Sequence, residues 1–217
     1  MIKDNIIRIQ AELPKAVQLV GAVKTRTAEE VLEAIEAGLG IIGHNYVQEA
    51  ERLFNLISQP VKWHMIGHLQ SNKAKKAAAI FDMIETVDSL KLSKALGKAC
   101  TPLNKTMPVL LEINSGEEHQ KAGVMPDNAP RLIEKISSLS NVKVMGLMTM
   151  GPFTDDPEES RPYFKKTKAL FDEIRALNIE NTEMSILSMG MSDSYRVAIE
   201  EGANMVRIGT KIFGERV

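Results

Sequence analysis

The sequence predicts an α/β protein that folds as a closed (β/α)8 TIM barrel, with a single domain over residues 1–217. Short apolar runs alternate with amphipathic stretches along the whole chain, which is typical of parallel βα units. Eight such units can be counted, and eight close a barrel. No linker or change of composition divides the chain. An open doubly wound sheet has a similar alternation and is the alternative.

Periodicity and capping residues place the elements in order, beginning with a leading helix in the first dozen residues. The strands are predicted at residues 17–23, 40–43, 61–65, 83–87, 109–113, 142–148, 183–187 and 204–208. The earlier helices are expected to begin at polar residues, which are Thr27 in a capping box with Glu30, Asn45, Ser71, and Asp88 with Ser89. Later helices are predicted over residues 132–139, 164–177 and about 192–202.

Composition argues against several classes of partner. Lys plus Arg is 27 and Asp plus Glu is 28, so the net charge of −1 gives no reason to expect nucleic acid or an anionic membrane. A lone cysteine, Cys100, fits a reducing compartment. The charged amino terminus does not resemble a signal peptide, and no apolar run approaches the roughly 18 residues that a spanning helix needs. We therefore expect a cytoplasmic protein.

Unusual polar residues gather where the predicted strands end, which is where barrels of this class carry their function. These clusters are Lys24, His44-Asn45, residues 64–73, Asn114-Ser115-Gly116, residues 148–150, residues 188–193 and residues 207–210.

Lys24 follows the apolar run at residues 19–23. Burial at a strand end disfavours the charged form of a lysine. The neutral amine is the nucleophile that forms a Schiff base with an aldehyde. Taken alone, a lysine that reaches out to solvent is the simpler interpretation. The remaining polar clusters favour the interpretation of Lys24 as a lysine that forms a Schiff base.

The loops after the last two strands are the usual phosphate site of this architecture. One contains Ser188, Gly190 and Ser192, and the other contains Gly209 and Thr210. Glycine allows close approach of the backbone, hydroxyl groups donate hydrogen bonds, and the helix start near Ser192 favours an anion. A cap or a turn explains either loop alone, whereas the two loops together favour phosphate binding.

Arg207 lies two residues before Gly209, so strand alternation points both residues to the same side. A lysine after the first strand, two phosphate loops and an adjacent arginine suggest pyridoxal 5′-phosphate (PLP) as the ligand. Its aldehyde would meet Lys24 and its ring nitrogen would face Arg207. A permanent cation there disfavours protonation of the ring nitrogen, which makes the ring a weaker electron sink.

At these positions the chain resembles the YggS/PROSC family of pyridoxal phosphate homeostasis proteins. The matching segments are residues 22–25, 45–49, 63–73, 87–90, 146–150, 187–193 and 206–214. Residues 63–73 and 187–193 are the most specific of these. The resemblance covers essentially the whole chain.

The resemblance implies a barrel like the amino-terminal domain of alanine racemase, with PLP held as a Schiff base on Lys24. It implies phosphate contacts from Ser192, Gly209 and Thr210, and from Ser188 as a further candidate. Arg207 would lie by the ring nitrogen, with Asn45 and Met189 near the ring. The family is regarded as carrying or regulating vitamin B6, with effects on amino-acid and keto-acid balance and with no established turnover. Apoenzymes that accept PLP are then candidate partners.

Two positions depart from the family pattern. An acidic residue usually precedes the Asn-Tyr pair, and this chain has His44 there. A small hydroxyl residue often precedes the lysine, and this chain has Val23. The first departure changes the charge expected beside the ring, and the second changes the rim of the lysine pocket.

An enzyme of the same fold, a racemase or decarboxylase, is the alternative function. Racemisation needs a second acid or base on the face opposite the lysine, which such enzymes take from an added domain, and this sequence ends directly after the last barrel motif. We therefore expect a binding protein, and by analogy a monomer. A metal site from His44, His64 and His68 is disfavoured, and loop histidines bonded to the backbone are expected instead. Residues 68–73 are left open as a partner or ligand loop.

Overall fold

The computed structural model describes residues 1–118, 120–152, 154 and 156–215, and it confirms the closed barrel. Eight strands follow one another in chain order around the barrel, and each pairs in parallel with its neighbours, β1 with β8 included. They are β1 (Gln18–Ala22), β2 (Ile41–His44), β3 (Lys62–Met65), β4 (Met83–Val87), β5 (Met107–Ile113), β6 (Val142–Thr149), β7 (Thr182–Ser188) and β8 (Met205–Ile208). Every predicted strand is present, with its ends shifted by at most two residues.

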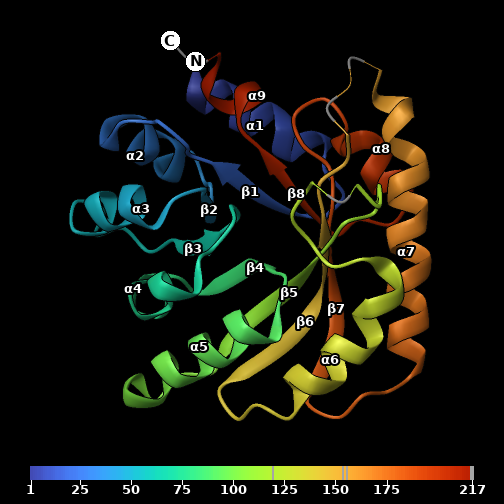
Figure 1. The fold of residues 1–217 in the computed structure, drawn as a ribbon. Helices are drawn as coiled ribbons and strands as arrows, with labels where there is room; N and C mark the ends of the chain where they lie inside the picture. Colours follow the sequence, from blue (N-terminus) through green and yellow to red (C-terminus); the bar gives the residue numbers. More distant parts are fainter. Residues whose placement is uncertain (119, 153, 155, 216–217) are drawn as a thin grey trace.

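Helices lie outside the barrel, as Figure 1 shows, with α2 to α5 on one side and α6 to α8 on the other. They are α1 (Ile2–Glu12), α2 (Ala28–Glu36), α3 (Val47–Phe54), α4 (Ala74–Ile80), α5 (Leu90–Cys100), α6 (Ala129–Ser137), α7 (Arg161–Ala176), α8 (Tyr195–Glu200) and α9 (Thr210–Phe213). The first helix packs against the last, where the Asn5 side chain donates to the Ile212 carbonyl at 3.0 Å. Among the described residues, no helix is both long and apolar enough to cross a bilayer.

Two of the predicted helix starts are confirmed. Thr27 and Glu30 form the expected capping box of α2, and the Ser89 hydroxyl accepts the Leu92 N–H at the start of α5. The prediction that Asn45 caps α3 is wrong, because the extended residue before that helix is Tyr46 and its side chain makes no capping bond.

The predicted helix over residues 192–202 is also shorter than expected. The chain first forms a turn, in which the Ser194 and Tyr195 N–H groups both donate to the Met191 carbonyl, and α8 begins only at Tyr195. The residues around Ser192 therefore belong to a loop.

Two kinds of core result from strand alternation. The larger core lies between the barrel and the helices and holds most of the buried apolar side chains. The barrel interior holds two small apolar clusters, one with Val20, Ile66 and Met205, the other with Leu110 and Met148. Polar side chains fill the space above these clusters, towards the carboxyl ends of the strands.

Candidate cofactor site

Lys24 lies two residues past the end of β1, in alternation with the interior residue Ala22, and is half-buried. Its Nζ atom lies 5.3 Å from the centroid of the Tyr46 ring, a cation–π arrangement. Thr25 follows with a φ of +64°, a conformation that a β-branched residue adopts only at a cost of about 1–3 kcal/mol. The backbone therefore turns sharply directly after the lysine.

The two predicted phosphate loops lie beside Lys24, because β8 pairs with β1. The Ser192 hydroxyl accepts the Gly209 N–H at 3.3 Å and the Lys211 N–H at 3.4 Å, which ties the first loop to the second. Gly209 lies against Ala22, where a Cβ would come within 3.4 Å of the Ala22 carbonyl oxygen. Thr210 is exposed as the first residue of α9. The loops thus present hydroxyl and N–H groups together.

Arg207 is 3 % exposed and projects into the barrel. One guanidinium nitrogen donates to the Ser188 hydroxyl at 2.5 Å, and another donates to the Thr149 carbonyl at 2.9 Å. The Ser188 hydroxyl in turn donates to a Glu85 carboxyl oxygen at 2.7 Å. Ser188 was predicted as a further phosphate contact, and in this structure its hydroxyl is already bonded to these two interior side chains.

Glu85 is the centre of this interior network and is fully buried. Its second carboxyl oxygen lies 2.8 Å from Nδ1 of His64, and Arg207 lies 3.9 Å from the first. Burial favours the protonated acid, but the bonds and charges of His64, Arg207 and Ser188 outweigh it and hold the pKa of Glu85 below its ordinary value. His64, Glu85, Ser188 and Arg207, here called the interior network, come from four different strands.

The prediction of loop histidines bonded to the backbone is wrong, because His44 and His64 lie on strands, and His68, which does lie in a loop, meets a side chain instead. His64 is on β3 and faces the Glu85 carboxylate. His44 is on β2 and stacks on Trp63 in the outer core, with ring centroids 5.0 Å apart, and neither ring nitrogen has a hydrogen-bond partner among the described residues. Burial lowers the pKa of His44 to about 4. His68 is exposed, with Nδ1 3.4 Å from an Asp88 carboxyl oxygen.

Asn45 and Met189, predicted near the ring, lie in different surroundings. Asn45 is half-buried at the barrel mouth, where Gly67 approaches so closely that a Cβ on Gly67 would come within 2.3 Å of the Asn45 carbonyl oxygen. Met189 is fully buried within the larger apolar core. The structure thus brings Lys24, Asn45 and the phosphate loops to one face, and it packs Met189 away from the opening.

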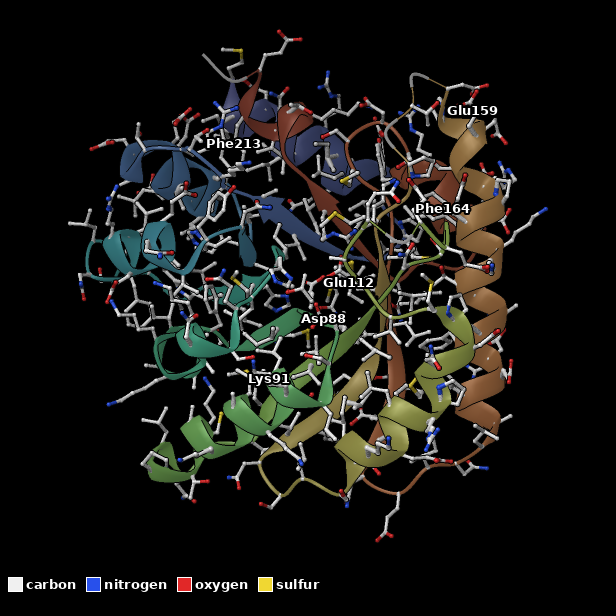
Figure 2. The ribbon with its side chains drawn as sticks, viewed as in Figure 1. Asp88, Lys91, Glu112, Glu159, Phe164 and Phe213 are labelled. Carbon is white, nitrogen blue, oxygen red and sulfur yellow. The ribbon has the colours of Figure 1, made fainter. Side chains whose placement is uncertain are left out.

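A cavity of about 440 Å³ opens at the same face. Its lining includes Asn45, His68, Glu112, Tyr163 and Met191. Figure 2 shows Glu112 near the middle of the barrel, with Asp88 next to it. Burial and the Asp88 charge raise the pKa of Glu112 above its ordinary value. This acid and Tyr163 were not singled out as site residues from the sequence.

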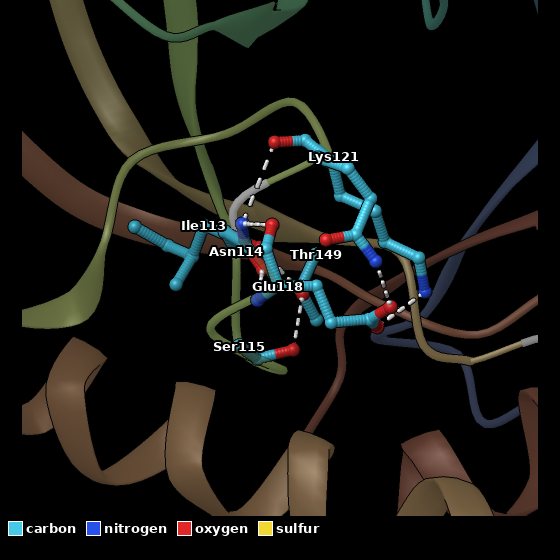
Figure 3. Close-up of polar contacts among 7 residues, drawn as sticks. Ile113, Asn114, Ser115, Glu118, Lys121 and Thr149 are labelled. Atoms are coloured by element: carbon cyan, nitrogen blue, oxygen red, sulfur yellow. Dashed lines mark hydrogen bonds and ion pairs between the residues drawn. The ribbon is translucent and has the colours of Figure 1, made fainter.

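The loop after β5 forms one wall of this cavity (Figure 3). The Asn114 side chain donates to the Glu118 carbonyl at 2.8 Å and accepts the Glu118 N–H at 3.1 Å. Lys121 pairs with the Glu118 carboxylate at 2.5 Å. At the base of the loop, Thr149 bonds to the Ser115 hydroxyl at 2.9 Å. The wall is therefore held by its own hydrogen bonds. Among the described residues, no group of three or more His, Cys, Asp or Glu side chains could hold a metal ion.

The closed barrel, the lysine after β1 and the two polar loops after β7 and β8 are features of a known class of protein. The family described as alanine racemase, N-terminal domain, matches residues 1–217. The fold is also that of the alanine racemase of Clostridium difficile, with a TM-score of 0.85 at 16 % identity, covering 99 % of this chain and 56 % of that one.

Within that class, the chain belongs to the family of pyridoxal phosphate homeostasis proteins. The relative of that name from Aquifex aeolicus is 42 % identical over 200 residues, which is 92 % of this chain and 87 % of the relative. The one from Pasteurella multocida is 35 % identical over 228 residues, 99 % and 97 % of the two chains. PipY of Synechococcus elongatus, solved with PLP bound, has a TM-score of 0.91 at 31 % identity and covers 99 % of this chain and 100 % of its own.

Proposed function

We propose that this protein binds PLP as a Schiff base on Lys24, and that it regulates and delivers PLP in vitamin B6 homeostasis. The observation that carries the proposal is that Lys24 lies beside the two proposed phosphate loops at the mouth of the barrel. The curated relatives of this chain are named pyridoxal phosphate homeostasis proteins. The Lys24 amine makes no hydrogen bond or ion pair with the described residues, so its attack on an aldehyde would give up only the cation–π contact with Tyr46.

The residues present fit the phosphate end of PLP. The Gly209 and Lys211 N–H groups now donate to the Ser192 hydroxyl over 3.3 and 3.4 Å, which are long distances for such bonds. A phosphate is a stronger acceptor and could take these donors together with the Ser192 and Thr210 hydroxyls. This assignment retains Ser192, Gly209 and Thr210 as proposed phosphate ligands.

Arg207 fits the ring-nitrogen role proposed for it. Its guanidinium is fixed at both ends, by Ser188 and by the Thr149 carbonyl, and so it is pre-oriented. When bound, PLP supplies an aldehyde and an electron-accepting ring. A fixed cation at the ring nitrogen would disfavour ring protonation and so weaken electron withdrawal. That suits storage and delivery of PLP better than catalysis.

The proposal also includes a cytoplasmic location, a monomer, and apo-PLP enzymes as acceptors. The curated relatives are named as homeostasis proteins rather than as enzymes. A racemase or decarboxylase activity is the alternative, and it would show as turnover of an amino acid by the loaded protein.

The test is an absorbance spectrum of the purified protein with added PLP, before and after borohydride, followed by peptide mapping of the reduced adduct. We expect a band that shifts on reduction and an adduct on Lys24. Lys24→Ala should lose both, while Lys62→Ala, at the opposite end of the barrel, should keep both. An adduct that persists elsewhere in folded Lys24→Ala protein would contradict the assignment.

A further inference from the structure

Glu112 is a buried acid that the proposed function does not use. Its side chain is 7 % exposed, and its Oε2 atom has no hydrogen-bond partner among the described residues. It lines the cavity of about 440 Å³ at the barrel mouth. A buried carboxyl without a partner is costly, and a bound cation would supply the missing interaction.

The rest of the lining indicates what kind of cation fits. Lys121 and Glu118 form an ion pair, so their charges offset each other. Arg207 and His68 act on the Glu112 charge through space, but among the described residues neither forms an ion pair or hydrogen bond with it, so the carboxylate is left without a contacting cation. Asn45 and Tyr163 also line the cavity, are half-buried, and make no side-chain hydrogen bond within the described part of the chain. The cavity therefore offers one acid together with a carboxamide and a phenol, which can donate to a carboxylate.

We propose that this cavity binds a free amino acid, with the ammonium group on Glu112 and the carboxylate end towards Asn45 and Tyr163. The volume suits a small ligand of this kind. The proposal rests on the proposed function in one respect, because Asn45 belongs both to this lining and to the predicted PLP site. An amino acid held here would lie beside PLP, so the protein would hold the two molecules at one mouth.

The experiment is a calorimetric titration with glycine, using two forms of the protein. One form carries PLP fixed by borohydride, so that glycine has no aldehyde to react with, and the other is free of PLP. Ethylamine and acetate are the companion probes, because each carries one of the two charged groups of glycine. Glu112→Gln is the test variant. Glu117→Gln is the matched control, since Glu117 is an exposed residue of the loop that follows β5 and pairs with Lys166.

We expect saturable glycine binding to the reduced, loaded protein, with ethylamine weaker and acetate weakest. Glu112→Gln should weaken glycine binding by about tenfold or more, and Glu117→Gln should not change it. Absence of glycine binding in both forms, equal affinity in Glu112→Gln, or exclusion of glycine by bound PLP would overturn the inference. PLP uptake, followed separately by absorbance, tests the proposed function. If PLP uptake fails, the PLP-free titration still tests the amino-acid site.

Discussion

Two buried glutamates on adjacent strands of one barrel differ in almost every respect. Glu85 on β4 is bonded to Ser188 and to His64 and lies near Arg207. Glu112 on β5 faces a cavity, and one of its carboxyl oxygens has no hydrogen-bond partner in the part of the chain that the structure describes. The pKa of the first is held below its ordinary value, and that of the second is raised. Burial alone therefore does not determine the state of an acid in this barrel, because the partners decide it.

The difference between the two glutamates also separates two parts of the barrel interior, the interior network around Glu85 and the cavity side around Glu112. The interior network is complete without a ligand, so it can fix the orientation of Arg207 before PLP arrives. The cavity side is incomplete, because Glu112 lacks a partner and the Asn45 side chain makes no hydrogen bond within the described residues. The pre-formed interior network suits a ligand that stays bound, such as the proposed PLP. The cavity side, with its unsatisfied polar groups, suits a ligand that exchanges.

Glu85→Ala should give the largest effect. It leaves His64 and Arg207 buried without their acid, so we expect a loss of about 3–5 kcal/mol in the free energy of unfolding. Urea denaturation at pH 7 measures this. The control is Glu183→Ala, which should lose far less stability because Glu183 forms an exposed ion pair with Lys143 and such pairs contribute little. If the two variants lost equal free energy of unfolding, the interior network would stabilise the protein no more than an exposed ion pair does. Because its pKa is lowered, Glu85 contributes stability above its ordinary pKa of 4.5, and that contribution is lost as the pH falls through the folded-state pKa.

His44→Phe tests a buried group that lacks partners but is neutral. With a folded-state pKa of about 4 against an ordinary 6.5, the unfolded chain takes up a proton first as the pH falls. The wild-type protein should therefore lose up to about 3 kcal/mol of stability between these two values, and most of that loss should be absent from His44→Phe. Phenylalanine can keep the stacking on Trp63. Parallel pH profiles for the two proteins would show that His44 does not titrate in this way.

Ser192→Ala tests the proposed phosphate loops, which should meet the ligand beside the interior network. Its hydroxyl would give a charge-assisted bond to the phosphate, so PLP retention should weaken by about 1.5–3 kcal/mol in binding free energy. Equilibrium dialysis against PLP measures the change. Ser194→Ala in the same loop is the control, because its hydroxyl accepts only the Met191 N–H. Unchanged retention in Ser192→Ala would argue against phosphate binding by these loops.

Much of the fold could be predicted because its signals are local. Alternating apolar runs and amphipathic stretches predict all eight strands, and the strand ends then place Lys24, Asn45, residues 188–193 and residues 207–210 at one mouth. The interior network could not be predicted in the same way. Glu85 meets Ser188 across 103 positions of the sequence, and only the register of strands on opposite sides of the barrel brings them together.

The residues that the sequence left unassigned did carry a signal. Glu85 and Glu112 each interrupt an apolar strand, and a charge in such a place is costly unless it is paired or used. Tyr163 directly precedes Phe164 in an amphipathic helical stretch, a position that by sequence alone favours core packing. The structure starts α7 at Arg161, so Tyr163 lies in the first turn and lines the mouth cavity.

Glu112→Gln should give the smallest effect and the opposite sign to Glu85→Ala. A raised pKa means that the acid favours folding while protonated, and that this contribution is lost as the pH rises from the ordinary value of 4.5 through the folded-state pKa. Once the acid is ionised, its buried charge has no hydrogen-bond partner at Oε2 among the described residues, and the neutral amide removes that charge in nearly the same volume. We expect the variant to be more stable by about 1 kcal/mol at pH 7, with the gain disappearing below pH 4.5, as measured by urea denaturation at both pH values. If Glu112→Gln were less stable than the wild-type protein at pH 7, Glu112 would have a partner in solution. Glu85 and Glu112 would then differ less than their contacts indicate.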